Sequence, residues 1–316
     1  HEGRKRNHEE LILGHEGSGG SNDGESNAVE RPISERAVAH TSRCRHPAVV
    51  RGKRAPDLPC GRSAQGSRSS PRMISRIRIG TAGWAIPSSA APDFPSNGST
   101  LERYASVFNA AEINSTFRRS HRAATYRRWS TTVPADFEFS VKVPKTITHM
   151  ARLVSCDDAV ALFHDEIANL GSTLGPLLLQ LPPSLPFAAD VLEPLCRSLS
   201  QSGQFQIACE PRHSSWFNVE VDQWLAARRI ARVASDPARH PGAEIPGGWR
   251  GLTYYRLHGS PRMYYSSYDS EALAQLEAQL VSDPADRIWC IFDNTASGAA
   301  AGNARLLRAR VGKSSS

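Results

Sequence analysis

Aromatic residues are missing from the first part of the chain. All 23 Phe, Tyr and Trp residues lie at or beyond Trp84, so residues 1–72 contain none. Those 72 residues carry 13 Lys and Arg, 9 Asp and Glu, and 23 Gly, Ser and Pro. A segment of this composition cannot bury enough apolar surface to offset the entropy lost on ordering it. We therefore expect residues 1–72 to be a disordered extension or leader, and the fold to begin at Met73, the first methionine.

Net charge is also scarce in the part expected to fold. The whole chain has a formal charge of +7 and a pI near 9.3, values that would suggest nucleic-acid binding. Residues 1–72 contribute +4 of this charge, which leaves +3 for the other 244 residues. A small anionic ligand is therefore favoured over nucleic acid as the partner.

The sequence has no apolar run long enough to cross a membrane and no signal-peptide core near its first residue. Its six cysteines form no C-x-x-C pair and no Cys/His spacing suited to zinc. Cys209 and Cys290 lie in apolar runs, where a free Cys acts as a small hydrophobe. These absences favour a reduced, cytoplasmic protein without a membrane partner.

Short apolar runs alternate with longer amphipathic segments from Met73 onward. Strands are predicted at residues 77–80, 111–114, 137–142, 177–181, 205–210, 230–234, 253–258 and 288–292. Helices are predicted at residues 101–109, 121–131, 157–170, 190–199, 219–227, 271–281 and 299–311, with Thr100 as the cap of the first. Only the strand at 230–234 is followed by a Pro- and Gly-rich stretch without helical periodicity.

This alternation indicates a parallel sheet covered by helices. Eight units in residues 73–311 match the size of a TIM-type (β/α)8 barrel that lacks one helix after strand 6, with residues 312–316 as a disordered tail. A doubly wound open sheet is the alternative. The barrel is favoured because the repeat count reaches eight. In addition, the segment from Gly80 to Gly83 lacks the third glycine of a dinucleotide-binding fingerprint.

Active sites of such barrels lie at the carboxyl ends of the strands, and every predicted strand ends in polar side chains. Burying a polar group unpaired costs about 1–3 kcal/mol, so this gathering indicates a shared cavity. The candidate catalytic residues are Glu112, Glu210 and His258. The candidate substrate-binding residues are Asn114, Lys142, His149, Gln180, Arg212, His213, Trp216, Arg256 and Asn294.

Structural roles compete with several of these assignments. Glu112 and Glu210 suit an acid–base pair, and each suits an ion pair with Lys142, Arg212 or Arg256 equally well.

His149 fits a cap of the following turn better than a substrate contact, and the ring of Trp216 fits substrate stacking and packing equally. The Tyr cluster at 264–268 suits either stacking on a ligand or a loop folded onto the rim. The small residues at 294–303 suit either an anion site at a helix N-terminus or close packing.

The order of the motifs resembles one known family. The motifs are I-G-T-A-G-W at 79–84, E-I-N-S-T-F at 112–117, F-E-F-S-V-K at 137–142, L-G-P-L-L-L-Q-L-P-P at 174–183, E-P-R-H-S-S-W at 210–216, Y-R-L-H-G at 255–259 and F-D-N at 292–294. Together they resemble the YecE-like family, domain of unknown function 72, over residues 77–311. The resemblance implies a TIM-type barrel with a strand-end pocket and implies no reaction. Arg118 and Asp293 depart from the residues common in the family.

Three functions remain open from the sequence. The favoured one is an enzyme, a hydrolase or lyase, that acts on a small anionic sugar, phosphosugar or nucleotide-like substrate held by the cations Lys142, Arg212 and Arg256. The first alternative is a metal-assisted phosphodiesterase on nucleic acid, with ligands from Glu112, Glu210, Asp236, His258 and Asp293. Three cations at the same mouth would repel a divalent metal, so we expect no metal and no cofactor. The second alternative is a non-catalytic ligand-binding barrel.

Overall fold

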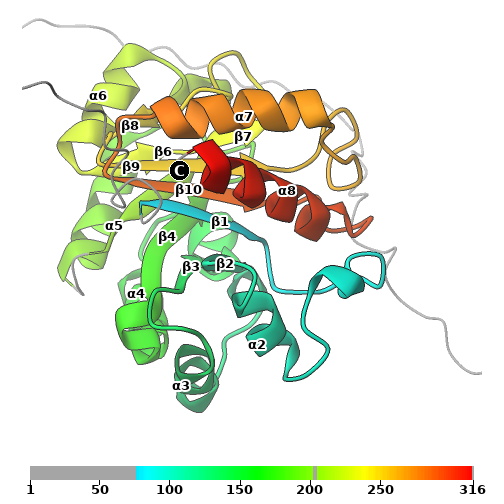
Figure 1. Cartoon of the computed structure of the whole chain (residues 1–316). Coiled ribbons are helices and arrows are strands. Elements are labelled where there is room, and N and C mark those ends of the chain that lie inside the picture. Colours follow the sequence, from blue (N-terminus) through cyan, green and yellow to red (C-terminus); the bar gives the residue numbers. More distant parts are fainter. Residues whose placement is uncertain (1–75, 202–204, 315–316) are drawn as a thin grey trace, which may run out of the picture. The chain divides into compact units, whose positions relative to one another are not determined.

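The computed structural model describes residues 76–201 and 205–314, so the expected extension at 1–72 lies outside the described residues. The strands are β1 Ile77–Thr81, β2 Ala110–Ile113, β3 Glu138–Lys142, β4 Leu174–Gln180, β5 Ile207–Glu210, β6 Ile230–Arg232, β7 Ala234–Asp236, β8 Gly247–Gly248, β9 Leu252–Leu257 and β10 Arg287–Phe292. The helices are α2 Thr100–Ala105, α3 Ala123–Thr132, α4 Asp157–Ile167, α5 Ala189–Gln201, α6 Val219–Ala227, α7 Ser270–Ser282 and α8 Ala299–Ser314. The chain therefore has an α/β fold built on parallel strands (Figure 1).

All eight predicted strands and all seven predicted helices are observed, with differences at their ends. The strand predicted at 230–234 is split at Val233 into β6 and β7. Helix α8 continues to Ser314, so residues 312–314 are helical and not part of a tail. The cap of α2 is Ser99 rather than Thr100. The Ser99 hydroxyl accepts from the backbone N–H of Glu102, and the Glu102 carboxylate accepts from the backbone N–H of Ser99.

No helix lies between β7 and β9 in this fully described segment, as the Pro- and Gly-rich composition predicted. The chain instead forms the short strand β8, which pairs antiparallel with β6. Arg232 holds this segment, because its guanidinium donates to both carboxylate oxygens of Asp222 and to the carbonyls of Gly242 and Ile245.

The parallel strands form two ladders, β2-β3-β4-β5-β6 and β7-β9-β10-β1. The ladders meet at two places. Val233, between β6 and β7, donates its N–H to the carbonyl of Cys209 at 2.8 Å. At the other junction, Ala82 bridges to Glu112, and Gly83 N donates to Glu112 O at 2.8 Å. Each of the eight parallel strand positions thus has a neighbour on both sides.

The junction of β1 with β2 requires a glycine. A Cβ placed on Gly80 would lie 2.0 Å from the carbonyl oxygen of Ala110, so no larger residue fits without displacing a strand. The buried hydroxyl of Tyr104 in α2 accepts from Thr81 N at 2.8 Å and donates to Ala110 O at 3.1 Å. The small size of Gly80 and the hydrogen bonds of Tyr104 together keep these two strands in contact.

Buried apolar side chains form two clusters. The larger lies between the strands and the helices, including α7 and α8, which run side by side across β9, β10 and β1 (Figure 1). The smaller faces the other side of the strands and consists of Ala110, Leu178, Ala208, Ala231, Val233, Leu252, Tyr254, Trp289 and Ile291. Side chains alternate along a strand, so the polar residues two positions later share this inner face at the carboxyl ends: Glu112, Gln180, Glu210, Arg256 and Asp293.

Within residues 76–201 and 205–314, none of the helices combines the length and the apolar character needed to span a bilayer. The four cysteines of this part, Cys156, Cys196, Cys209 and Cys290, are buried and form no disulfide. Cys209 and Cys290 lie in β5 and β10 with the apolar neighbours that their sequence context predicted.

Candidate functional site

Arg256 in β9 stands at the centre of a buried charge cluster. Its side chain is 1% exposed. Its Nη2 lies 2.9 Å from Oε1 of Glu112 and 2.9 Å from Oδ2 of Asp293, and its Nη1 lies 3.2 Å from Oε2 of Glu210. Burial alone would lower the pKa of Arg256, but these three carboxylates raise it well above its usual value. One guanidinium therefore links the ends of four strands: β2, β5, β9 and β10.

His258 bridges two of the same carboxylates. Its Nε2 lies 2.9 Å from Oε1 of Glu210 and its Nδ1 lies 3.0 Å from Oδ2 of Asp293. Burial would lower the pKa of His258, but Glu210 and Asp293 raise it. A ring with a carboxylate oxygen at each nitrogen is suited to the doubly protonated form, which donates from both, and neither nitrogen is open to a substrate in this arrangement.

Titration of His258 tests this arrangement. Because folding raises its pKa above 6.5, His258 stabilises the fold fully below pH 6.5 and loses that contribution as pH rises through the folded pKa. We expect an NMR midpoint for its imidazole above 6.5, and a wild-type stability that falls relative to His258→Gln over the same pH range. His121 is an internal control, because burial and then Arg119 lower its pKa. A His258 midpoint at or below that of His121 would contradict the bridge.

Neutral side chains complete the bonding of the two glutamates. Gln180 donates from Nε2 to Oε2 of Glu210 at 2.8 Å. The hydroxyl of Tyr254 lies 3.0 Å from Oε2 of Glu112 and 2.9 Å from the hydroxyl of Ser140. A hydroxyl carries one proton, so Tyr254 donates to the carboxylate and accepts from Ser140. Every carboxylate oxygen of Glu112 and Glu210 is therefore an acceptor for another side chain.

These contacts form an ion-pair network, which was the structural alternative to an acid–base role for Glu112 and Glu210. Burial would raise the pKa of Glu210, but Arg256, Arg212 and His258 hold it well below its usual range. The carboxylate of Asp293, also buried, has its pKa lowered by Arg256 and His258. Glu210 and Asp293 are therefore ionised at neutral pH.

Lys142 at the end of β3 differs from the other cations of the site. Its side chain is 6% exposed, and its Nζ lies 4.2 Å from the ring centroid of Phe117. Among the described residues, no carboxylate or other acceptor lies within hydrogen-bonding distance of this Nζ. Burial and then Arg256 lower the pKa of Lys142 to about 8, although Glu112 and Glu210 oppose the shift.

The side chains of His149 and Arg212 lie near this part of the site. The ring of His149 packs edge-on against Phe117 with centroids 5.0 Å apart, and burial, Lys142 and Arg212 lower the pKa of His149. Arg212 is half-buried, with Nη2 3.5 Å from Oε1 of Glu210. Burial would lower the pKa of Arg212, but Glu210 and then Tyr264 raise it. The sequence favoured His149 as a cap of the following turn. In the structure its Nδ1 is hydrogen-bonded to the hydroxyl of Thr148 at 2.9 Å.

Asn114 and His213 lie just past the ends of their strands. Asn114 is half-buried before the 3-10 turn Ser115–Phe117, and its side chain makes no hydrogen bond to another described residue. His213 accepts through Nδ1 from the backbone of Ser215 and so caps the turn Ser214–Trp216. Neither residue joins the ion-pair network.

Trp216 and Asn294 are buried by packing. Trp216 is 1% exposed and donates from Nε1 to the carbonyl of Leu185 at 3.0 Å, as the packing alternative predicted. Asn294 donates from Nδ2 to the carbonyl of Ser266 and to Oδ1 of Asn303, both at 2.9 Å. Trp216 thus connects two loops, and Asn294 connects its loop to the loop at Ser266 and to α8.

The Tyr cluster and the small-residue segment close the rim together. Tyr264 packs edge-on against His258 with centroids 5.6 Å apart, and its carbonyl accepts from Ala296 N. Tyr268 donates to Oδ2 of Asp236 at 2.6 Å. A Cβ on Gly298 would lie 3.0 Å from Cβ of Pro87, so the small residue serves close packing. These contacts favour the rim-packing alternative for both segments.

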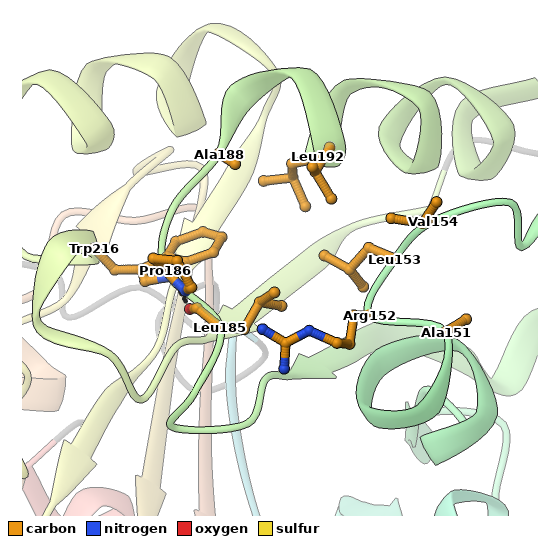
Figure 2. Close-up of a pocket in the computed structure, with 10 residues that line it drawn as sticks. Ala151, Arg152, Leu153, Val154, Leu185, Pro186, Ala188, Leu192 and Trp216 are labelled. Atoms are coloured by element: carbon orange, nitrogen blue, oxygen red, sulfur yellow. Dashed lines mark hydrogen bonds between the residues drawn. The ribbon is translucent and has the colours of Figure 1, made fainter. Parts of the chain in front are cut away.

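An apolar cavity of about 330 Å³ opens among the segments that follow β3, β4 and β5 (Figure 2). Its lining comes from the loops after β3, β4 and β5 and from the first turn of α5: Ala151, Arg152, Leu153, Val154, Leu185, Pro186, Ala188, Val191, Leu192 and Trp216. The guanidinium of Arg152 crosses it and donates to the hydroxyl and the carbonyl of Ser184 at 3.0 and 2.8 Å. The same three loops begin at Lys142, Gln180 and Glu210, so the cavity and the charge cluster share the carboxyl side of the strands.

A metal centre finds little support in this arrangement. In the described part of the chain, no group of three or more His, Cys, Asp and Glu side chains is arranged to hold a metal ion. Asp236 is bonded to Tyr268, and the guanidinium of Arg256 occupies the space among the three carboxylates.

Sequence reasoning missed Tyr254 and Ser140, and it named Asp293 only as a metal ligand. A signal was present, because Tyr254 precedes Arg256 by two positions and Ser140 precedes Lys142 by two, which places each pair on one face of its strand. Tyr254 and Ser140 were missed because they lie within strand segments whose other residues are mostly apolar core residues.

Parallel strands covered by helices, with ionised side chains gathered at the carboxyl ends of the strands, define an α/β protein with a strand-end polar site. A family model for a protein of unknown function, DUF72, matches residues 78–316. The chain belongs to the DUF72 family, as the motif order predicted.

Relatives and solved structures agree with this assignment. The chain is 34% identical to the UPF0759 protein YecE of Escherichia coli (strain K12) over 166 residues, which cover 51% of this chain and 59% of YecE. It is 23% identical to the UPF0759 protein YunF of Bacillus subtilis (strain 168) over 263 residues, which cover 73% of this chain and 93% of YunF.

Two crystal structures of DUF72 family proteins are similar in fold. The protein EF0366 from Enterococcus faecalis V583 has a TM-score of 0.64 at 20% identity, covering 75% of this chain and 95% of its own. The protein TM1631 from Thermotoga maritima MSB8 has a TM-score of 0.62 at 24% identity, covering 75% and 99%. At these identities the similarity establishes the fold alone.

Proposed function

We propose that the protein is an enzyme that binds a small anionic substrate at the carboxyl mouth of a TIM-type barrel. Support for the barrel comes from the two strand junctions, because each parallel strand position has two neighbours and polar side chains gather at one end. Such a mouth is where barrels bind their substrates.

The observation that carries the proposal is the unpartnered charge of Lys142. The three buried carboxylates are matched one for one by three cations, Arg256, Arg212 and the imidazolium of His258. The ammonium of Lys142 is therefore left without a partner in a buried position, which is costly. A phosphate or carboxylate group of a substrate would supply the missing charge and would also meet Arg212 and His149.

The roles of the sequence candidates change accordingly. Lys142, Arg212 and His149 contact the substrate in this proposal. Glu112, Glu210 and His258, which the sequence suggested as acid and base groups, act as fixed charges that hold Arg256 and Arg212 in place. Preorganised charges of this kind are an effective way to stabilise charge that develops during a reaction.

Thermal unfolding with anionic ligands tests the proposal. Inorganic phosphate, phosphosugars and nucleotides are each added to the wild type and to Lys142→Met, Arg212→Met and Arg287→Met. A ligand at ten times its Kd stabilises a fold by about 1.4 kcal/mol. We expect at least one of these anions to stabilise the wild type and Arg287→Met equally, because Arg287 lies at the amino end of β10, and to lose its effect in the other two variants.

An anion that stabilises Lys142→Met as much as the wild type would contradict the proposed site, as would the absence of any shift. Measuring product formation distinguishes an enzyme from a non-catalytic binding barrel. Each anion that binds is incubated with the protein and followed by NMR for product, and unchanged ligand throughout would favour the non-catalytic alternative.

A further inference from the structure

We infer that Lys142 is a nucleophilic amine that forms an imine with an aldehyde or ketone group of the substrate. This inference rests on the proposed function and adds a substrate class to it, a carbonyl compound that carries an anionic group. It begins from the position of Nζ, which is buried against the ring of Phe117 and has no acceptor among the described residues.

The surroundings of Lys142 keep the amine in one place and leave it unbonded. The hydroxyl of Thr116 donates to the backbone carbonyl of Lys142 at 2.6 Å, and the residue pairs with Leu178 of β4. The side chain projects from this fixed backbone toward Phe117 at 4.2 Å. By contrast, Arg256 and Arg212 contact carboxylates and are not free to react.

The choice of lysine is informative in this chain. The sequence has 33 Arg and only 5 Lys, and the other lysines of the described region, Lys145 and Lys313, are exposed. A guanidinium binds anions at least as well as an ammonium, but it does not lose its proton in proteins. A lysine at a buried cationic position that has no acceptor among the described residues is what an amine nucleophile requires.

Burial is the main reason that the neutral amine of Lys142 is favoured. Burial and Arg256 lower its pKa to about 8, against the opposing carboxylates Glu112, Glu210 and Asp293. At pH 7 about one tenth of Lys142 is then neutral, which is about 300 times the neutral fraction of a lysine at the usual 10.5.

The chemistry balances without an oxidant or a reductant. The lone pair of the neutral amine attacks the carbonyl carbon, a C–N bond forms, and the carbonyl oxygen takes up a proton. The carbinolamine then expels that oxygen as water and leaves a protonated imine, so that ammonium plus carbonyl gives iminium plus water. The iminium carries the same single positive charge as the ammonium and stays near the same three carboxylates, so no new buried charge is created.

Pyridoxal 5′-phosphate is a suitable probe, because it joins an aldehyde to a phosphate. The full chain is incubated with it near pH 7.5, reduced with borohydride, and mapped by peptide mass spectrometry, which also resolves the α-amino group. We expect labelling of Lys142 to exceed that of Lys145 by at least about tenfold, because the neutral fraction of Lys142 is larger. The rate of labelling should rise with pH with a midpoint near 8.

Two matched variants separate chemistry from binding. Lys142→Arg keeps the positive charge and should lose the label, whereas Lys145→Arg should be labelled like the wild type. Preferential labelling of Lys145, or equal total labelling of Lys142→Arg, would overturn the inference. If phosphate stabilises the wild type but Lys142 is not labelled, the proposed function survives and the imine does not. If propionaldehyde, which has no charge, labels Lys142 as well as the phosphate probe does, the imine survives and the anionic substrate does not.

Discussion

Replacing Arg256 with Met is expected to destabilise the protein by about 3–5 kcal/mol, because it leaves the buried carboxylates Glu112, Glu210 and Asp293 without their shared cation. Urea unfolding at pH 7 measures the change. Arg305→Met is the control. Its ion pair with Asp93 lies at the surface, with side chains 39% and 38% exposed, and should be worth no more than about 1 kcal/mol.

The pH dependence and a second variant identify the cause. Glu210 and Asp293 have lowered folded-state pKa values in the wild type, so they stabilise the fold above their unfolded pKa values and lose that contribution as pH falls. The difference between Arg256→Met and the wild type should therefore shrink in acid. Adding Glu112→Gln to Arg256→Met should recover part of the lost stability, since one unpaired charge is removed. A loss below about 1 kcal/mol for Arg256→Met would show that the carboxylates do not depend on this guanidinium.

Replacing Lys142 with Met is expected to stabilise the fold, by up to about 3 kcal/mol at pH 7. The pKa of Lys142 falls from 10.5 to about 8 on folding, and each unit corresponds to about 1.4 kcal/mol. Because folding lowers this pKa, the penalty is complete below pH 8 and disappears as pH rises to 10.5. The advantage of Lys142→Met should therefore vanish near pH 10.5, as measured by urea unfolding at several pH values.

Lys145→Met provides the matched control for this variant. Lys145 lies three positions along the chain and is exposed, so its replacement should change stability by less than about 0.5 kcal/mol at any pH. If Lys142→Met is instead less stable than the wild type at pH 7, Lys142 has an anionic partner in the protein and the proposed anion site is wrong. A stabilising replacement of a substrate-binding residue fits the usual conflict between stability and function.

Periodicity in the sequence was sufficient for the order of the helices and of the parallel strands. The run at 230–234, followed by Pro and Gly, correctly predicted a strand without a following helix, because an amphipathic pattern is needed to cover a sheet and none was present. The division of this strand at Val233 was not predictable. At this division Val233 donates its N–H to the carbonyl of Cys209, where the two ladders meet.

The candidate site was predicted in part. Residues inside the strands, Glu112, Lys142, Gln180, Glu210 and Arg256, meet at the carboxyl ends, since alternation sets which side of the strand a side chain faces. His258, one position past β9, joins them. Some other residues past the strand ends do not join the cluster, because alternation ends with the strand. Trp216 and Asn294 turn instead into packing between loops.

The sequence by itself determined the family, the order of strands and helices, and the set of charged groups at the strand ends. Only the tertiary structure decided how those charges are paired. Arg256 and Glu112 are 144 positions apart, and their contact depends on strand register and closure, which no local pattern encodes. That pairing leaves Lys142 as the buried cation without a carboxylate in the described chain, because three cations already match the three carboxylates.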